Sequence, residues 1–190
     1  MIIYLHGFSS AAASRKAAFL KQELSQYNFL VPEYPSHQPK ISIDFLTDYV
    51  KAKIRERNNE PLMLMGSSLG GYYAQYLGVH LDAVNKVVLL NPALQPRKTL
   101  KPYIGQQTNM VIGKSFIFTQ QNFDELAQYK VSTKDVVAPT LVLLDEGDEV
   151  IEYRFAEAQY KDIGRVLIYP DGSHRFDHLE EAVQEIEVFY

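Results

Sequence analysis

Residues Pro61 to Tyr76, with the sequence PLMLMGSSLGGYYAQY, decide the fold. The apolar run at residues 62–65 is long enough for a buried strand and too short for a helix. It leads into GSSLG at residues 66–70, a G-x-S-x-G pattern, after which aromatic and small residues recur at helical spacing. A strand, a sharp turn and a helix in this order predict a nucleophile elbow with Ser68 at its apex.

Ser68 is therefore the candidate nucleophile. The glycines two residues before and after it remove β-carbons that would collide in so tight a turn. The turn would present the hydroxyl at the N-terminus of the following helix, where free amides stabilise a developing oxyanion. The alternative interpretation is a glycine–serine turn that leads into an ordinary helix.

Outside this stretch, strand-like and helix-like segments alternate. The amphipathic segments predict helices, among them one capped by Ser14, one capped by Ser42 and a last one that carries Phe176 to Phe189 on one side. Apolar runs predict strands at Ile2–Leu5, Phe29–Val31, Leu62–Met65, Val84–Leu90, Thr140–Leu144 and Arg165–Tyr169. Such an order predicts a mostly parallel sheet of about six strands with helices on both faces.

The segment from about residue 95 to residue 137 breaks this alternation. It contains prolines, glycines and the apolar patch Phe116-Ile117-Phe118, with a short helix expected near Asp124 to Tyr129. We expect one domain over residues 1–190, in which this segment is a small lid or insertion. An extra pair of surface helices is the alternative. If the segment is a lid, the patch at residues 116–118 is expected to form an apolar acyl pocket.

A serine nucleophile needs a base, and the chain offers five histidines. His174 follows the last predicted strand in a turn, DGSHRF, from which it can reach over the sheet, so it is the predicted base. His178 is the second choice because it is expected inside the final helix. His37 and His80 are expected on the surface, and His6 is expected to shape the loop after the first strand.

The acid is expected at a strand end between the serine and the histidine. The stretch LLDEGDEVI at residues 143–151 supplies several carboxylates. Asp148 is preferred because it lies in the loop after the strand, and Asp145 at the strand end is the alternative. The order Ser68, Asp148, His174 is that of the α/β-hydrolases. An oxyanion hole would use the amides of Leu69 and Phe8.

Composition excludes several other classes of function. With 46% apolar residues, 22% charged residues and a formal charge of −4, the chain is typical of a globular protein without a nucleic-acid surface. It has no cysteine for thiol catalysis or thiolate metal sites. No membrane span or signal peptide is recognised, so we expect a cytoplasmic protein. No nucleotide-binding motif occurs and we expect no cofactor.

A metal site is the competing interpretation of the last loop. His174, Asp177 and His178 are spaced like helical metal ligands. There is no H-E-x-x-H motif, no further ligand cluster is obvious, and Arg175 would place a cation beside them. We therefore expect no metal.

With these residues in place, the chain resembles the α/β-hydrolase superfamily over most of its length. More narrowly, it resembles the small bacterial YqiA/YcfP-type esterases. The residues that carry this resemblance are IIYLHGF at 2–8, GSSLGGY at 66–72, LNPA at 90–93, GDEV at 147–150 and GSHRF at 172–176. The resemblance implies a serine carboxylesterase, with thioesterase activity on acyl-CoA as a further implication. The chain departs from the larger hydrolases in that it starts at the strand before the oxyanion loop, so we expect six strands and no large cap domain.

The sequence thus predicts a serine hydrolase that acts on a small-molecule ester or thioester through Ser68, His174 and Asp148. Two alternatives remain at this point. The same triad serves amide or carbon–carbon bond hydrolysis, because a fold does not fix a reaction. The chain could also be a ligand-binding module with a vestigial triad.

Overall fold

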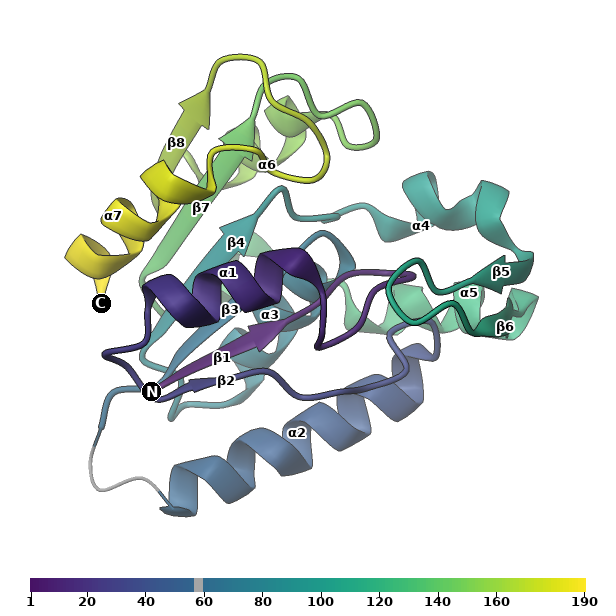
Figure 1. Cartoon of the computed structure of the whole chain (residues 1–190), viewed down its shortest axis with the longest axis horizontal. Coiled ribbons are helices and arrows are strands. Elements are labelled where there is room, and N and C mark those ends of the chain that lie inside the picture. Colours follow the sequence, from purple (N-terminus) through teal and green to yellow (C-terminus); the bar gives the residue numbers. More distant parts are fainter. Residues whose placement is uncertain (57–59) are drawn as a thin grey trace.

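The computed structural model describes residues 1–56 and 60–190. Its main element is a parallel sheet of six strands in the order β2-β1-β3-β4-β7-β8 (Figure 1). The strands are β1 (Ile2–Leu5), β2 (Phe29–Leu30), β3 (Met63–Ser67), β4 (Lys86–Leu90), β7 (Thr140–Asp145) and β8 (Arg165–Tyr169). The predicted number, direction and approximate position of these strands are confirmed.

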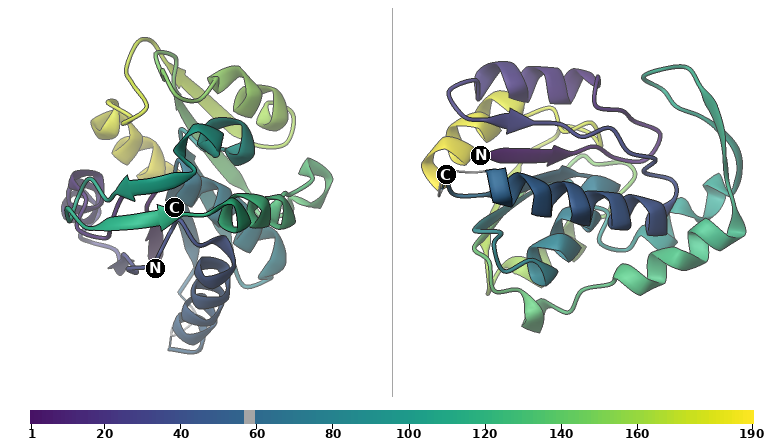
Figure 2. Two further views of the ribbon diagram at one scale, coloured as in Figure 1. Left: turned by 90° about the vertical axis from the view of Figure 1, so that its right-hand side faces the viewer. Right: turned by 90° about the horizontal axis from the view of Figure 1, so that it is seen from below.

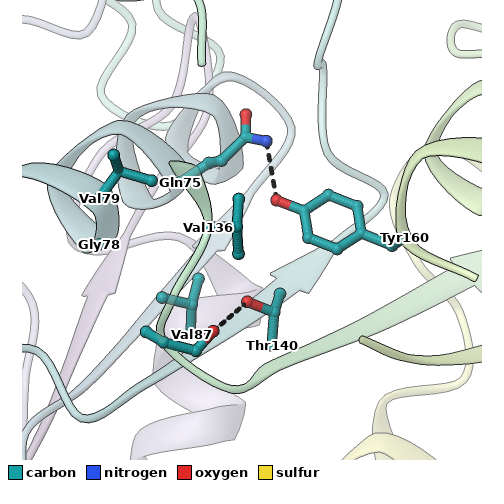
Figure 3. A pocket seen from close by; sticks show the side chains of 8 residues that line it. Gln75, Gly78, Val79, Val87, Val136, Thr140 and Tyr160 are labelled. Carbon is teal, nitrogen blue, oxygen red and sulfur yellow. Dashed lines mark hydrogen bonds between the residues drawn. The ribbon is translucent and has the colours of Figure 1, made fainter. Parts of the chain in front are cut away.

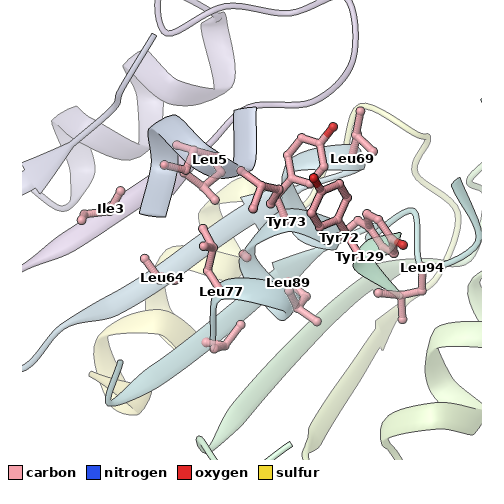
Figure 4. Packing of buried hydrophobic residues seen from close by; sticks show 14 of the residues in the cluster. Ile3, Leu5, Leu64, Leu69, Tyr72, Tyr73, Leu77, Leu89, Leu94 and Tyr129 are labelled. Carbon is pink, nitrogen blue, oxygen red and sulfur yellow. The ribbon is translucent and has the colours of Figure 1, made fainter. Parts of the chain in front are cut away.

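Helices cover both faces of this sheet, as the continuous apolar strands require (Figures 1 and 2). On one face, α1 (Arg15–Glu23) and α7 (Leu179–Phe189) bury their apolar sides against the strands. On the other face lie α2 (Pro39–Glu56), α3 (Leu69–His80) and α6 (Tyr153–Tyr160). Figure 4 shows this second core, in which Leu64 and Leu89 of the sheet meet Tyr73 and Leu77 of α3.

The chain order places the carboxyl ends of the strands at one edge of the sheet. From β1 the chain moves outward to β2, returns to β3 on the other side of β1, and then continues outward through β4, β7 and β8. Parallel pairing carries the loops after β1, β3, β4, β7 and β8 to the same edge. Sites of α/β proteins form at such an edge.

The segment after β4 contains more regular structure than the sequence predicts. Its elements are α4 (Pro96–Leu100), η1 (Lys101–Tyr103), β5 (Gly105–Thr108), β6 (Ser115–Phe118), α5 (Gln120–Glu125), η2 (Leu126–Tyr129) and η3 (Thr133–Asp135). The sequence predicts no strand in this segment, whereas β5 and β6 form an antiparallel hairpin. Figure 2 shows this hairpin at the edge where the central strands end. The sequence of β5, GQQT, is polar and gives no strand signal.

Two helix predictions need correction, and one helix was not predicted. Helix α2 begins at Pro39, a residue suited to the first helical position, so Ser42 lies inside the helix and donates to the carbonyl of Pro35 at 2.8 Å. Helix α7 begins only at Leu179, so the buried Phe176 belongs to the preceding loop. Helix α6 was not predicted at all. The predicted cap at Ser14 is confirmed, since its hydroxyl accepts from the amide of Ala17.

Candidate active site

Ser68 lies at the turn between β3 and α3, as an elbow requires. Its backbone has φ 54° and ψ −123°, a conformation that residues with a side chain rarely adopt. The turn is tight enough that a β-carbon on Gly66 would lie 2.2 Å from the carbonyl oxygen of Gly70. A β-carbon on Gly70 would lie 2.1 Å from the carbonyl oxygen of Leu5. Only glycine fits at these two positions, and the pattern in the sequence has this steric cause.

The structure brings Ser68, His174 and Asp148 together from three separate loops. The Nε2 atom of His174 lies 3.1 Å from the hydroxyl oxygen of Ser68. The Nδ1 atom of His174 lies 2.9 Å from Oδ2 and 3.1 Å from Oδ1 of Asp148. These distances form an unbroken chain from carboxylate to imidazole to hydroxyl, which is the geometry that activates a serine.

Burial differs along this chain. The side chain of Asp148 is 1% exposed, whereas that of His174 is 24% exposed. The amides of Val150 and Ile151 donate to Oδ1 of Asp148 at 2.9 and 2.8 Å, so the buried carboxylate is fixed by its own loop. The backbone amide of His174 donates to the carboxylate of Glu149 at 2.9 Å, and this hydrogen bond holds the pKa of Glu149 below its usual range. The loops that carry acid and base are thereby joined twice.

The two amides expected to bind an oxyanion lie beside the serine. Leu69 begins α3, and Phe8 follows Gly7, whose β-carbon, if present, would lie 3.1 Å from the β-carbon of Ser68. Within residues 1–56 and 60–190, neither the amide of Phe8 nor that of Leu69 donates to a protein acceptor. Both residues line the same cavity as Ser68. Two unused amides beside a serine can hold a developing negative charge.

His6 braces the loop that carries Phe8. It is buried, its ring stacks on Tyr34 with 4.3 Å between centroids, and its Nδ1 lies 3.1 Å from the carbonyl oxygen of Gly7. The hydroxyl of Tyr34 donates to the carbonyl of His6 at 2.5 Å. Burial lowers the pKa of His6 below its usual value, while the nearby carboxylate of Glu33 acts in the opposite direction.

A cavity of about 290 Å³ opens in front of Ser68 and His174. Its volume is close to the lower end of the range for small-molecule sites. The segment at residues 95–137 supplies part of the wall. Four candidate site residues line the cavity: Phe8, Ser68, Leu69 and His174. The rest of the lining comprises Ser9, Ala93, Thr99, Leu100, Tyr103, Gln107, Thr108, Met110, Val150 and Ile151.

The apolar patch at residues 116–118 does not line this cavity, contrary to expectation. Phe118 is fully buried, and its ring packs edge-on against Phe8 with 5.1 Å between centroids. Phe116 also packs on Phe8, and Ile117 is 64% exposed outside the cavity. The patch therefore fastens the hairpin to the loop after β1.

Backbone and side-chain hydrogen bonds attach the hairpin tip to the same loop. The amide of Met110 donates to the carbonyl of Ser9 at 2.9 Å, and the side-chain amide of Asn109 donates to the carbonyl of Ser10 at 2.7 Å. The hairpin thus reaches across the mouth of the cavity.

A second, much smaller cavity lies between α3, β4 and α6 (Figure 3). Its volume of about 10 Å³ is enough for a single water molecule at most. Gln75 and Tyr160 point into it and share a hydrogen bond of 2.7 Å. This cavity is a packing feature of the core, far too small for a substrate.

The alternative acid and base form a pair of their own. Nδ1 of His178 lies 2.8 Å from Oδ1 of Asp145, so His174 and His178 face different carboxylates. His178 precedes α7 instead of lying within it. Of the remaining histidines, His80 is exposed, whereas His37 is half-buried against Phe116.

The described residues give no support to a metal centre at this loop. In the ranges 1–56 and 60–190, no group of three or more histidine and carboxylate side chains is placed to hold a metal ion. In the same ranges no helix is long and apolar enough to span a membrane.

Two residues beside the site were missed by the sequence analysis. Asn91, at the end of β4, accepts from the amide of Asp145 and donates to the carbonyl of Ser173. Lys16 of α1 donates to the hydroxyl of Ser67 at 2.7 Å, directly before the elbow serine. The Asn91-Pro92 break after an apolar run was visible, but nothing in the sequence connects Lys16 with the elbow.

Comparison with known proteins places the whole chain in one family. Residues 1–190 match the family described as "Uncharacterised protein family (UPF0227)". The chain belongs to this family. One UPF0227 relative, the UPF0227 protein YcfP of Escherichia coli O9:H4 (strain HS), is 24% identical over 189 residues, which cover 100% of this chain and 98% of the relative.

Solved structures show the fold of this UPF0227 member. Est1E from Butyrivibrio proteoclasticus aligns with a TM-score of 0.79 at 16% identity, covering 99% of this chain and 85% of Est1E. Mouse alpha/beta hydrolase domain-containing protein 10 aligns with a TM-score of 0.72 at 16% identity, covering 99% and 88% of the two chains. The protein has the α/β-hydrolase fold, as the elbow sequence predicts.

Proposed function

We propose that this protein is a serine hydrolase that cleaves carboxylic esters or thioesters of small molecules through an acyl-enzyme. Ser68 is the nucleophile, His174 the general base and acid, and Asp148 the group that orients the imidazole. The observation that carries the proposal is the continuous chain of contacts from Asp148 through His174 to Ser68, at 2.9 and 3.1 Å. The α/β-hydrolase fold is consistent with it, although a fold alone does not fix a reaction.

The first half of the reaction forms the acyl-enzyme. His174 Nε2 takes the proton of the Ser68 hydroxyl as its oxygen bonds to the substrate carbonyl carbon. The carbonyl oxygen becomes an oxyanion, which the amides of Phe8 and Leu69 stabilise. When this intermediate collapses, the bond to the alcohol or thiol breaks, and the leaving group takes the proton from His174.

The second half regenerates the enzyme. His174 removes a proton from a water molecule, and the resulting hydroxide attacks the acyl carbon. The Ser68–acyl bond then breaks, the serine recovers its proton from His174, and a carboxylic acid leaves. Asp148 holds the Nδ1 proton throughout, which keeps Nε2 free to accept one. The single domain acts as a unit, with the segment at 95–137 as the roof of the substrate cavity through Leu100, Tyr103 and Met110.

Fluorophosphonate labelling followed by intact-mass measurement tests this proposal. The wild type should gain one adduct, Ser68→Ala should gain none, and His174→Gln should be labelled far more slowly. Ser132→Ala, which changes an exposed serine outside the cavity, is the matched control and should be labelled like the wild type. An adduct that persists in Ser68→Ala, or a folded wild type that gains none, would contradict the assignment.

A panel of p-nitrophenyl esters and acyl-CoA thioesters then tests the substrate class. The proposal expects turnover of at least one series, with release of one acid for each alcohol or thiol. Labelling of Ser68 without turnover of either series would contradict the ester and thioester assignment and would direct attention to amide or carbon–carbon bond cleavage.

A further inference from the structure

The carboxylate of Asp145 lies behind the proposed triad and is fully buried. It accepts three hydrogen bonds from one short loop: from the amide of Ser173 at 3.2 Å, from the amide of Asp177 at 2.6 Å and from Nδ1 of His178 at 2.8 Å. The imidazole of His178 also stacks on Tyr169 with 4.9 Å between centroids. Three donors from one loop therefore converge on this buried carboxylate.

These hydrogen bonds fix the loop on both sides of His174. Ser173 lies immediately before it and Asp177 three residues after it. Asn91 fixes the carbonyl of Ser173 at 2.9 Å and the amide of Asp145 at 2.8 Å, which links the loop to two strand ends. The approach is so close that a β-carbon on Gly172 would lie 2.2 Å from Oδ2 of Asp145. Asp145 therefore fixes the backbone on both sides of His174.

Lys16 of helix α1 brings an amino group to the same region. Its ammonium donates to the hydroxyl of the buried Ser67 at 2.7 Å and lies 5.9 Å from the ring centroid of Phe176. Burial lowers the pKa of Lys16 to about 8, while Asp145, Asp148 and Asp177 act in the opposite direction. The ammonium interacts with both buried carboxylates, Asp145 and Asp148.

The ionisable groups around the proposed base come from four segments. They are Lys16 of α1, Asp145 of β7, Asp148 and Glu149 of the following loop, and Arg175, Asp177 and His178 of the loop that carries His174. Asp148 contacts the imidazole directly. The partly buried Lys16 and the fully buried Asp145 carry side chains of opposite charge type and have no direct contact with the imidazole.

We propose that Asp145 and Lys16 are positioning residues that hold the His174 loop and the elbow and balance the charge behind them, so that the imidazole stays neutral and ready to accept a proton. The proposal rests on the proposed function, because it takes His174 as the base. Without a cation nearby, the carboxylates of Asp145 and Asp148 would both stabilise the protonated form of the His174 imidazole. The ammonium of Lys16 cancels one of those two charges.

The two substitutions that remove these charges should act in opposite directions. Lys16→Met removes a positive charge, favours the protonated imidazole and should move the titration midpoint of His174 to higher pH. Asp145→Asn removes a negative charge and should move it to lower pH. By Coulomb's law, a unit charge about 10 Å away shifts a titration midpoint by about 0.3 pH units at the dielectric constant of water, which is about 80. At an effective protein dielectric constant of about 20, the shift is about 1.2 pH units. We expect shifts of about half a unit.

NMR titration of the histidine ring signals between pH 5 and 8 tests this without the need for turnover. The chain has five histidines, and the signals of His174 are identified by their loss in His174→Gln. Lys16→Arg keeps the charge and should restore the wild-type midpoint. Arg15→Met is the matched control, because it removes an exposed cation from the neighbouring position of α1 and should leave the midpoint unchanged.

Kinetics add a second readout if the protein turns over an ester. Misplacement of a base by about 1 Å costs on the order of 100-fold in rate. Asp145→Asn should therefore lower kcat by about 10- to 100-fold with little change in KM, and the acidic limb of its pH–rate profile should follow the NMR midpoint. A fall in kcat with an unmoved limb would leave Asp145 a merely structural residue and overturn the proposal.

The proposal is also overturned if Lys16→Met and Asp145→Asn move the midpoint in the same direction, or if Arg15→Met moves it as far as Lys16→Met. Should Asp145→Asn fail to fold, the comparison of Lys16→Met, Lys16→Arg and Arg15→Met decides alone. Opposite shifts in a protein that fluorophosphonate does not label would uphold the charge balance and refute the proposed function. Labelling of Ser68 without any shift would do the reverse.

Discussion

The strained backbone of Ser68 allows a sharp test of the elbow through stability alone. Two substitutions, Ser68→Ala and Ser68→Gly, both remove the hydroxyl and its 3.1 Å contact with His174. They differ in one respect. Alanine keeps the β-carbon that makes φ 54° and ψ −123° unfavourable, whereas glycine adopts these angles freely.

The magnitude follows from two opposing effects. A residue held in such a sparsely populated region costs about 1 to 3 kcal/mol, which Ser68→Gly recovers and Ser68→Ala does not. Glycine also gives the unfolded chain more freedom, which costs about 0.5 to 1 kcal/mol relative to alanine. Strain relief is the larger effect, so Ser68→Gly should be more stable than Ser68→Ala by about 1 kcal/mol. In a chain of this length that corresponds to a Tm higher by about 2 to 4 °C.

Thermal and urea unfolding of the two variants measures this difference. Ser132 provides the control pair, because its backbone is ordinary extended chain with φ −84° and ψ 137°. There the glycine variant should be less stable than the alanine variant by about 0.5 to 1 kcal/mol. If Ser68→Gly is no more stable than Ser68→Ala, or if both sites show the same sign, the elbow stores no strain and the argument is refuted.

Three further predictions concern the loops around the site. Gly172→Ala combines φ +76° with a β-carbon 2.2 Å from a buried carboxylate oxygen and should cost about 3 kcal/mol in urea unfolding, whereas Gly113→Ala, at φ +68° with nothing within 4 Å, should cost about 1 kcal/mol; equal costs would contradict the packing. Burial lowers the pKa of His6 in the folded protein, so as the pH falls the unfolded chain protonates this histidine before the folded chain does. The free energy of unfolding should therefore fall as the pH drops through about 6.5, by at most about 1.4 kcal/mol at pH 5.5. His6→Gln should flatten that part of the stability profile, and an unchanged profile would assign the loss to other groups. Leu100→Ala should lower kcat/KM for esters with long apolar acyl groups by about tenfold, while Ile117→Ala, outside the cavity, should not change it.

The fold could be predicted because its signals are local and strong. The strands β1, β3, β4 and β7 are buried on both faces, so each is a continuous apolar run in the sequence. Such a run is recognised as a buried strand without any alternation of polar and apolar residues. The hairpin of β5 and β6 could not be predicted, because half of each strand is exposed and β5 is entirely polar apart from its glycine. Its stability comes from tertiary contacts of Phe116 and Phe118 with Phe8, which no local pattern records.

The candidate site was predictable in its members but not in its pairing. Sequence order and strand ends point to two carboxylates and two histidines, and both pairs exist in the structure. What separates Asp148 from Asp145 is the path of a few loop residues. Asp145 is the last residue of β7 and contacts His178. Asp148 lies three residues later, in the turn after β7, where it contacts the His174 ring that in turn contacts Ser68. Periodicity carries no information on such a path, and Lys16 is found only once α1 is packed against the sheet.

The positions of backbone strain lead to one more step. In the described ranges, five residues other than glycine have positive φ: Ser9, Ser68, Asn91, Asp171 and Phe176. All five lie in loops that follow the carboxyl ends of β1, β3, β4 or β8, and none lies at the opposite edge of the sheet. A fold selected for stability alone would have no reason to gather strain at one edge, since each such residue costs about 1 to 3 kcal/mol. Glycine substitutions at the partly exposed Ser9 and the exposed Asp171 should therefore stabilise the chain in urea unfolding. Phe176→Gly should destabilise it, because the loss of a buried ring outweighs the strain that is relieved.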